Sequence, residues 1–327
     1  MERRTTAAWL LPLGCAAGIA LAQTAAAQGW TPQRHVEFVV PAGAAGSMDT
    51  AMRTVEQVAR ELKVVPVSTG VVNRAGGEHA VAYTYLQQRP GDPHLLCLTS
   101  TVLLTNHISG VLPLTYTDVT PVATLIAEYY LFVVGKDSPF KTAKDLVEAL
   151  RQRPESVSIA GGNLPQRMAI GQVLQAVNAD IKRVKIVTIS GAKTTLTVAG
   201  GHVDVGVAAP GQALALIESG LVRPLAISGP RRLGGSLAAV PTWAELGINQ
   251  AEYTAWRAVI APKGITSAQV AYWEDVMRRV TESEEFHKVA AKHQWDITFR
   301  GAADARKFME TEYAQYKRVM SFMGIVK

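Results

Sequence analysis

The stretch VEFVVPAGAAGSMDT, residues 36–50, joins an apolar strand to a helix through a loop of small residues. The segment at 36–40 has the β-branched and aromatic content of a buried strand. From about Asp49, apolar residues recur at helical spacing, at Met52, Val55, Ala59 and Leu62. The order of strand, glycine-containing loop and helix is the first unit of an alternating α/β chain.

The same alternation continues along the chain. Strands are predicted within 65–73, 94–100, 129–137, 157–160, 184–190, 203–209 and 223–228. Helices are predicted through Leu86, over 142–152 and 163–177, and near the C-terminus. The helix at 163–177 is expected to carry one apolar stripe, at Ile170, Val173, Leu174 and Val177. Alternation predicts parallel sheets with helices on both faces. The units are too many for one compact sheet, so we expect an α/β protein of two lobes, with the long strand at 129–137 crossing between them.

Three helices carry signals at their ends. Thr142 is a candidate N-cap. Asn163 is another, with Pro165 in the first turn and Gln166 completing a capping box. The segment PTWAELG at 241–247 predicts a very short helix, with Thr242 as N-cap, Glu245 three residues later and Gly247 as the stop.

The first 27 residues have the pattern of a secretory signal peptide. A basic start, MERR, precedes the apolar run AAWLLPLGCAAGIALA and the small residues AAA at 25–27, which predicts cleavage near Ala27 and Gln28. The signal peptide predicts that the protein is exported to the periplasm. A membrane anchor, a lipoprotein at Cys15 and twin-arginine export through Arg3 and Arg4 are the alternatives.

Composition indicates a folded protein of modest charge. Charged residues make up 18% of the 327 residues and hydrophobic residues 48%. Cleavage removes Glu2, Arg3 and Arg4 and lowers the formal charge from +6 to +5. No polybasic block or aromatic-interleaved basic stripe is present, so nucleic acid is not an expected partner. Only Cys97 remains after cleavage, which excludes an intrachain disulfide.

The loop at 42–46 is a candidate anion site. Free amides at a helix N-terminus carry partial positive charge, and small residues leave them uncovered for a carboxylate or phosphate. The alternative is a tight turn capped by Ser47, with Asp49 placed favourably in the first helical turn. The loop lacks the spacing of a nucleotide-binding loop, and Ser47 has no nucleophile elbow around it.

Other polar residues also follow predicted strands. Gly161, Gly162 and Asn163 repeat the small-residue loop in the second half, and Arg167 could supply a bidentate donor to a carboxylate. Ligands of parallel sheets bind beyond the carboxyl ends of the strands. The alternatives are helix capping and, for Arg167, a solvated surface position. The remaining candidates at strand ends are Ser100, Thr101 and Ser190.

A metal site is not expected. His202 and Asp204 lie together in GGHVD, but a metal needs more convergent ligands than this pair. The other histidines are not clustered. No cofactor is expected either, and no nucleophile and base are evident that would make the protein a hydrolase.

Five segments together resemble the extracytoplasmic binding proteins of tripartite tricarboxylate transporters, the Bug or TctC-like family. The family pattern V-V-P-F-x-x-G-G-x-x-D is similar to VVPAGAAGSMD at 39–49. N-[KR]-P-G-G-x-G is similar to NRAGGEH, G-G-x-[VI]-D to GGHVD, P-T-x-x-E-x-G to PTWAELG, and R-G-x-x-x-P-x-G to RAVIAPKG. The five occur in the family's order and cover nearly all of the mature chain.

The resemblance implies a two-lobed periplasmic-binding fold of type II, each lobe a mainly parallel sheet flanked by helices, with a ligand cleft between the lobes. Lobe 1 would comprise 28–128 plus 253–327, and lobe 2 would comprise 129–252. The implied partners are a small carboxylate and a membrane permease of one large and one small subunit. The protein would be a monomer without enzymatic activity. The implied ligand contacts are Ala44, Ala45, Gly46, Ser47 and Asp49, with the neighbourhood of Ser100, Gly162, Ser190 and Asp204.

Departures from the family pattern concern specificity. Ala75 stands where proline is usual, Glu78 and His79 where small residues are usual, and Gln166 and Arg167 where a polar residue and histidine are frequent. We expect Asp49 to cap the helix or to accept a hydrogen bond from a ligand hydroxyl, amine or water. A periplasmic sensor that presents its ligand to a signalling protein is the alternative function, and a secreted hydrolase is a more distant one.

Overall fold

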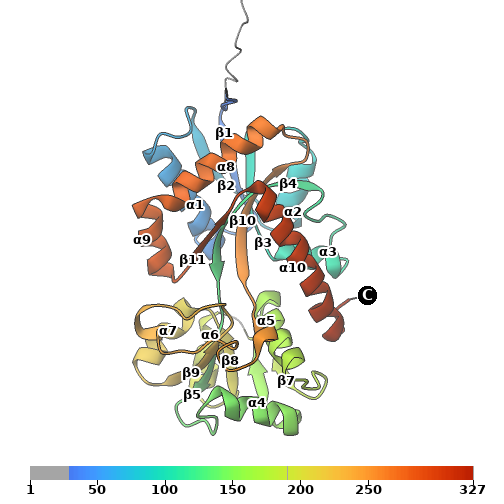
Figure 1. Cartoon of the computed structure of the whole chain (residues 1–327), viewed down its shortest axis with the longest axis vertical. Helices are drawn as coiled ribbons and strands as arrows, with labels where there is room; N and C mark the ends of the chain where they lie inside the picture. The colour runs from blue at the N-terminus through green and yellow to red at the C-terminus, as the bar shows by residue number, and fades with distance from the viewer. Residues whose placement is uncertain (1–28, 190, 327) are drawn as a thin grey trace, which may run out of the picture.

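The computed structural model describes residues 29–189 and 191–326, which form two lobes, each built on one sheet (Figure 1). The predicted signal peptide at 1–27 lies outside the described residues. The first sheet has the order β11-β4-β10-β3-β1-β2 and the second the order β7-β6-β8-β5-β9. The first sheet contains β1 (Val36–Val40), β2 (Thr69–Asn73), β3 (Leu95–Ser100), β4 (Val119–Glu128), β10 (Ala255–Pro262) and β11 (Asp296–Arg300). The second contains β5 (Leu131–Gly135), β6 (Ser158–Ala160), β7 (Lys185–Val187), β8 (Val205–Ala208) and β9 (Val222–Ile227).

Both sheets are mixed, which corrects the expectation of mainly parallel sheets. In the first, β1 runs parallel to β2 and β3, whereas β10 runs antiparallel to β3 and β4. In the second, β6 runs parallel to β7 and β8, whereas β5 runs antiparallel to β8 and β9. In the first sheet β11 also runs antiparallel to β4. Of the strands that break the parallel pattern, β5 and β10 are the first that the chain enters after each crossing between the sheets.

Helices flank each sheet (Figure 1). The first lobe carries α1 (Ser47–Glu61), α2 (Ala80–Gln87), α3 (Val102–Ile108), α8 (Ser267–Glu282), α9 (Glu284–His293) and α10 (Ala302–Phe322). The second carries α4 (Ala143–Gln152), α5 (Leu164–Ala176), α6 (Ala192–Ala199) and α7 (Pro210–Glu218). Short 3₁₀ turns lie at η1 (Gly77–His79), η2 (Pro154–Ser156), η3 (Gly235–Leu237) and η4 (Asn249–Ala251).

The apolar stripes expected on two helices form the core, with one exception. On α1, Met52, Val55 and Ala59 are buried, but Leu62 is 40% exposed because the helix ends at Glu61. On α5 and its C-terminal cap the expected stripe is buried throughout, at Ile170, Val173, Leu174 and Val177. Among the described residues, no helix is long and apolar enough to cross a membrane.

The end signals are confirmed for two of three helices. Thr142 and Asn163 both form capping boxes, with Asp145 and Gln166 respectively. At 241–247 the hydrogen bonds between Thr242 and Glu245 also form, yet the segment makes turns and no helix. Seven residues do not offset the cost of starting a helix here.

Two chain crossings connect the lobes, one between β4 and β5 and the other between β9 and β10. Ser228 forms hydrogen bonds to residues of both crossings. The first crossing runs from Glu128 at the end of β4 to Leu131 at the start of β5. Ser228 follows β9, and its Oγ accepts a hydrogen bond from the Tyr130 amide at 2.9 Å and donates one to the Tyr253 carbonyl at 2.7 Å. The rings of Tyr130 and Tyr253 stack with centroids 6.0 Å apart. Tyr130, Ser228 and Tyr253 thus lie together where the chain passes between the lobes.

Candidate functional site

The strand ends of the first sheet that face the second lobe form one edge of that sheet. Polar side chains from distant parts of the sequence lie along it. Val40 pairs with Asn73 at the ends of β1 and β2. Arg257, near the start of β10, pairs with Ser100 at the end of β3, and Ala255 pairs with Glu128 at the end of β4. Since the chain passes from Glu128 straight into the second lobe, this edge borders the space between the lobes.

The start of α1 is uncapped at this edge. Gly46 is the N-cap residue and supplies no side chain, so the alternative of a Ser47 cap is wrong. The first helical hydrogen bond runs from the Thr50 amide to the Gly46 carbonyl at 2.9 Å. Among the described residues, the amides of Ser47, Met48 and Asp49 have no hydrogen-bond acceptor. The start of a 15-residue helix therefore presents free donors to an anion.

The Asp49 side chain holds this loop in shape. The residue is 3% exposed, and its carboxylate accepts hydrogen bonds from the Ala45 amide at 2.9 Å, from Asn73 Nδ2 at 2.8 Å and from Arg53 Nε at 2.9 Å. Ala45 itself has a left-handed backbone, with φ of 61°. Asp49 thus does not cap α1, contrary to our first expectation for it, and the Ala45 amide is occupied by Asp49.

The pKa of Asp49 reflects these contacts. Burial acts to raise it, but hydrogen bonds from Arg53, Asn73 and Ala45 outweigh burial and hold the pKa below its usual value. The carboxylate is therefore ionised at neutral pH, and it forms an ion pair with Arg53.

Arg257 is the site residue that sequence reasoning missed. Its Nη2 donates to Ser47 Oγ and to Glu128 Oε2, each at 2.7 Å, and the residue is 8% exposed. Trp295 Nε1 donates to the other carboxylate oxygen of Glu128 at 2.8 Å. The available sequence signal was an arginine inside the apolar segment WRAVIAP, which needs a charged or polar partner once the strand is buried.

The loop before α2 lies close to Arg257. Glu78 and His79 both have left-handed backbones, and Asn106 Nδ2 donates to the Glu78 carbonyl at 2.7 Å, which fixes the loop. The Glu78 side chain is exposed. Burial, together with the positive charge of Arg257, lowers the pKa of His79 to about 4. The imidazole is therefore neutral near pH 7.

In the second lobe, the expected free amides are occupied. Gln166 Oε1 accepts from the Gly162 amide at 2.9 Å and from the Asn163 amide at 3.2 Å. Asn163 Oδ1 in turn accepts from the Gln166 amide. The capping box that the sequence predicted thus removes these two amides from the set available to a ligand.

Arg167 has an open guanidinium. It makes no side-chain hydrogen bond or ion pair with any described residue, and its Nε is buried without a partner. Gly171, one helical turn later, packs against Val319 of α10 and against Met323, which follows that helix in the first lobe. Residues four apart share a helix face, so Arg167 starts from the side of α5 that faces the first lobe.

Three further predicted residues differ in their placement. Ser100 lies at the site edge beside Arg257, and Thr101 is buried at the start of α3. Asp204 lies at the opposite end of β8, where its Oδ2 accepts from the Ser158 amide at 2.8 Å and Ser158 Oγ at 2.6 Å. Since Ser158 begins β6 and Gly162 follows its end, the structure does not bring Asp204 together with the other candidates. Ser190 lies outside the described residues.

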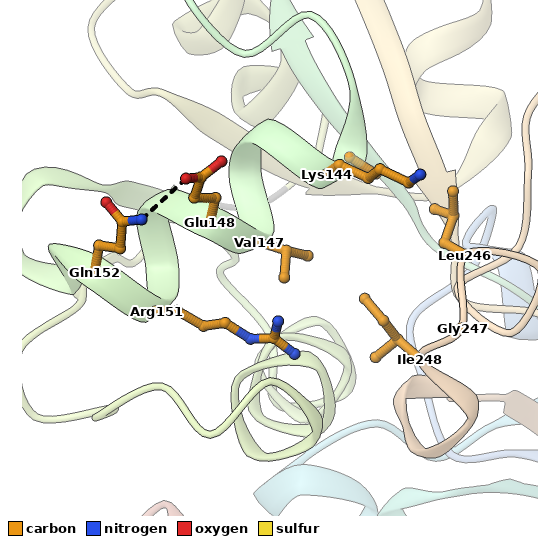
Figure 2. Close-up of a pocket in the computed structure, with 9 residues that line it drawn as sticks. Lys144, Val147, Glu148, Arg151, Gln152, Leu246, Gly247 and Ile248 are labelled. Atoms are coloured by element: carbon orange, nitrogen blue, oxygen red, sulfur yellow. Dashed lines mark hydrogen bonds between the residues drawn. The ribbon is translucent and has the colours of Figure 1, made fainter.

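A large surface pocket is separate from this edge. It has a volume of about 600 Å³ and lies between α4 and the segment 246–248. Figure 2 shows Lys144 and Arg151 extending from α4 toward that segment, while Glu148 and Gln152 hydrogen-bond to each other. None of the predicted ligand residues lines this pocket. Within the described residues no group of three or more side chains could hold a metal ion.

A comparison with protein families identifies one family for this chain. The model of the tripartite tricarboxylate transporter family receptor, TctC, matches residues 52–325. A UPF0065 protein of a Pseudomonas species is 27% identical over 256 residues, which cover 76% of this chain and 75% of that protein.

Solved structures show the same fold. A TctC solute-binding protein from Polaromonas has a TM-score of 0.78 at 21% identity, covering 89% of this chain and 99% of that one. An R. palustris protein solved with adipate has a TM-score of 0.72 at 24% identity, covering 90% and 99%. With the family match over most of its length, the chain belongs to the TctC family of tripartite tricarboxylate transporter receptors.

Proposed function

We propose that the protein captures a small carboxylate between its two lobes and delivers it to the membrane permease of a tripartite tricarboxylate transporter. The observation that carries this proposal is the uncapped start of α1 beside the Arg257 guanidinium, at the sheet edge that faces the second lobe. Free helix amides and an arginine are the donors that recognise carboxylates. The R. palustris relative with adipate, a dicarboxylate, supports the same ligand class.

Binding would close the lobes about the two crossings. The proposed lobes are 28–128 plus 253–327 and 129–252, and the hinge contains Tyr130, Ser228 and Tyr253. A ligand held by Ser47 and Arg257 on one side and by Arg167 on the other would stabilise the closed state, because it contacts both lobes only when they approach. Ala44, Gly46 and Ser100 would complete the first-lobe wall.

The remaining parts of the proposal concern setting and partners. The protein would act in the periplasm after removal of 1–27, as a monomer, and would engage a permease of one large and one small subunit. It would bind its ligand unchanged and would need no cofactor. The family description as a receptor supports a binding role.

A thermal-shift screen tests this proposal. The purified protein would be heated with mono-, di- and tricarboxylates, aromatic acids and acidic amino acids. A ligand present at about one hundred times its dissociation constant adds roughly 2.7 kcal/mol to the stability, enough to raise the Tm by several degrees. Mass spectrometry of the denatured protein would first establish that no ligand has co-purified. A flat response from empty protein would overturn the carboxylate assignment.

A further inference from the structure

We infer that the ligand is a carboxylic acid with a hydrogen-bond donor on the neighbouring carbon, a 2-hydroxy or 2-amino acid. Its carboxylate would bind Arg257, and its hydroxyl or ammonium group would bind Glu128. This inference rests on the proposed function and names the substrate class of the same site.

Part of the Arg257 guanidinium makes no hydrogen bond with a described residue. Both of its hydrogen bonds, to Ser47 and to Glu128, come from Nη2. Nε is buried without a partner, whereas Nη1 is not among the buried atoms and has no acceptor in the described part of the chain. A buried arginine therefore presents one end nitrogen to the space beside the free amides of α1. A carboxylate can accept from both at once.

The Glu128 carboxylate can accept a further hydrogen bond. One oxygen accepts from Arg257 at 2.7 Å and the other from Trp295 at 2.8 Å, with the Ser47 hydroxyl further away at 3.4 Å. An ionised carboxylate has about four acceptor positions. Glu128 therefore retains room for one further donor. Its side chain is 16% exposed, so that donor can come from a ligand.

The charges of Arg257 and Glu128 bear on which ligand the site accepts. Arg257 and Glu128 neutralise each other, so this pair does not compensate the negative charge of a carboxylate bound at Arg257, and Arg167 would reach the ligand only from the second lobe. The start of α1 offsets only part of that charge. His79 is neutral near pH 7 and adds no positive charge. An ammonium group on the ligand would restore balance beside Glu128, and a hydroxyl group would satisfy its open acceptor position.

The geometry links the two contacts. Glu128 binds one end nitrogen of the guanidinium and the other end nitrogen is open. A carboxylate on the open nitrogen consequently lies beside Glu128, where a donor on the adjacent carbon of the same ligand can reach it. An acid without that donor would leave two carboxylates facing each other.

Two matched ligand series test the inference by calorimetry. The first is propionate, lactate and alanine, and the second is succinate, malate and aspartate. We expect the hydroxy or amino member of at least one series to bind ten-fold or more tightly than its unsubstituted parent. A preference for the amino acid would identify the ammonium group as the donor, and a preference for the hydroxy acid would identify the hydroxyl group.

Variants separate recognition from folding. Glu128→Gln keeps an acceptor but loses the charge, so the preference for an ammonium donor should fall at least ten-fold while the unsubstituted acid binds as well or better. Arg257→Gln should weaken every ligand one hundred-fold. The double variant removes the ion pair together and guards against misfolding caused by one uncompensated charge. Arg34→Gln, which breaks an exposed ion pair with Asp92, is the control and should change nothing.

Three outcomes would overturn the inference. One is equal binding of substituted and unsubstituted acids. Another is a preference for the amino acid that stays unchanged in Glu128→Gln. The third is silence of both series while other carboxylates bind, which would leave the proposed function intact and remove only the substrate class. Silence of every carboxylate would overturn both.

Discussion

Asp49 and Asn73 are joined by a hydrogen bond of 2.8 Å between Oδ1 and Nδ2, which ties the first turn of α1 to the end of β2. Asn73 Nδ2 also donates to the Ala42 carbonyl at 3.0 Å. We predict that Asp49→Asn lowers the free energy of unfolding by about 2–3 kcal/mol, since an amide cannot accept from all three donors around it. Chemical denaturation measures this change.

The matched control for Asp49→Asn is Asp137→Asn, for which the structure gives no side-chain hydrogen bond to a described residue. It should leave stability unchanged. Ligand binding by Asp49→Asn should also weaken, because the Ala45 amide and the loop shape are released together. Wild-type stability and affinity in Asp49→Asn would contradict the structural role assigned to this carboxylate.

The hinge should depend on one hydroxyl group. Ser228→Ala leaves the Tyr130 amide without its acceptor and removes a donor to the Tyr253 carbonyl, and Ser228 is 1% exposed. We expect a loss of about 1–3 kcal/mol in unfolding free energy. Ser236→Ala, at an exposed position in η3, is the control. If both variants unfold at the same denaturant concentration as the wild type, Ser228 does not hold the crossings together.

Gly229 is the other sensitive hinge position. A Cβ atom placed there would lie 2.7 Å from the ring of Tyr129, which is 2% exposed and cannot move freely. We predict that Gly229→Ala costs about 1–3 kcal/mol through overpacking. Gly234→Ala meets open space at a backbone conformation that alanine adopts readily, so it should be neutral. Equal Tm values for the two variants would show that the hinge accommodates the methyl group.

Glu312 should make stability depend on pH. Burial raises its pKa to about 7, against hydrogen bonds from Tyr316 and Trp256 that lower it. The folded protein holds this proton more tightly than the unfolded chain does. The resulting stability is fully present below about pH 4.5 and is lost as the pH rises to 7, by about 3 kcal/mol.

Glu312→Gln isolates that contribution. The difference in unfolding free energy between wild type and variant should change between pH 5 and pH 7 and level off outside that window. His79, whose pKa is lowered to about 4, acts oppositely by destabilising the fold as the pH falls below 6.5, but it cancels in the difference. A difference that is constant with pH would show that Glu312 titrates normally.

Much of the fold follows from local patterns in the sequence. The strand VEFVV, the stripe on α5, the N-cap at Thr142 and the capping box at Asn163 all form as expected, because each depends on residues within one element. A residue's place relative to the site is a different matter. The resemblance implied that Asp204 contacts the ligand together with Gly162, but Asp204 precedes β8 and lies at the far end of that strand.

The site could be predicted only in part, for the same reason. The loop at 42–46 was visible as a run of small residues before a helix. Its partners were not, because Ser47, Glu128, Arg257 and Trp295 come from four separate segments that meet only after the first sheet forms. The Gln166 capping box was predicted correctly, yet its consequence for the Gly162 amide required atomic positions.

The most direct measurement is a structure of the complex with the tightest-binding carboxylate from the thermal-shift screen. We predict that the ligand carboxylate lies between the lobes, within hydrogen-bond distance of Arg257 Nη1 and of an amide at the start of α1. A carboxylate bound elsewhere, for example in the pocket between α4 and the segment 246–248 with the start of α1 left empty, would contradict the proposed site.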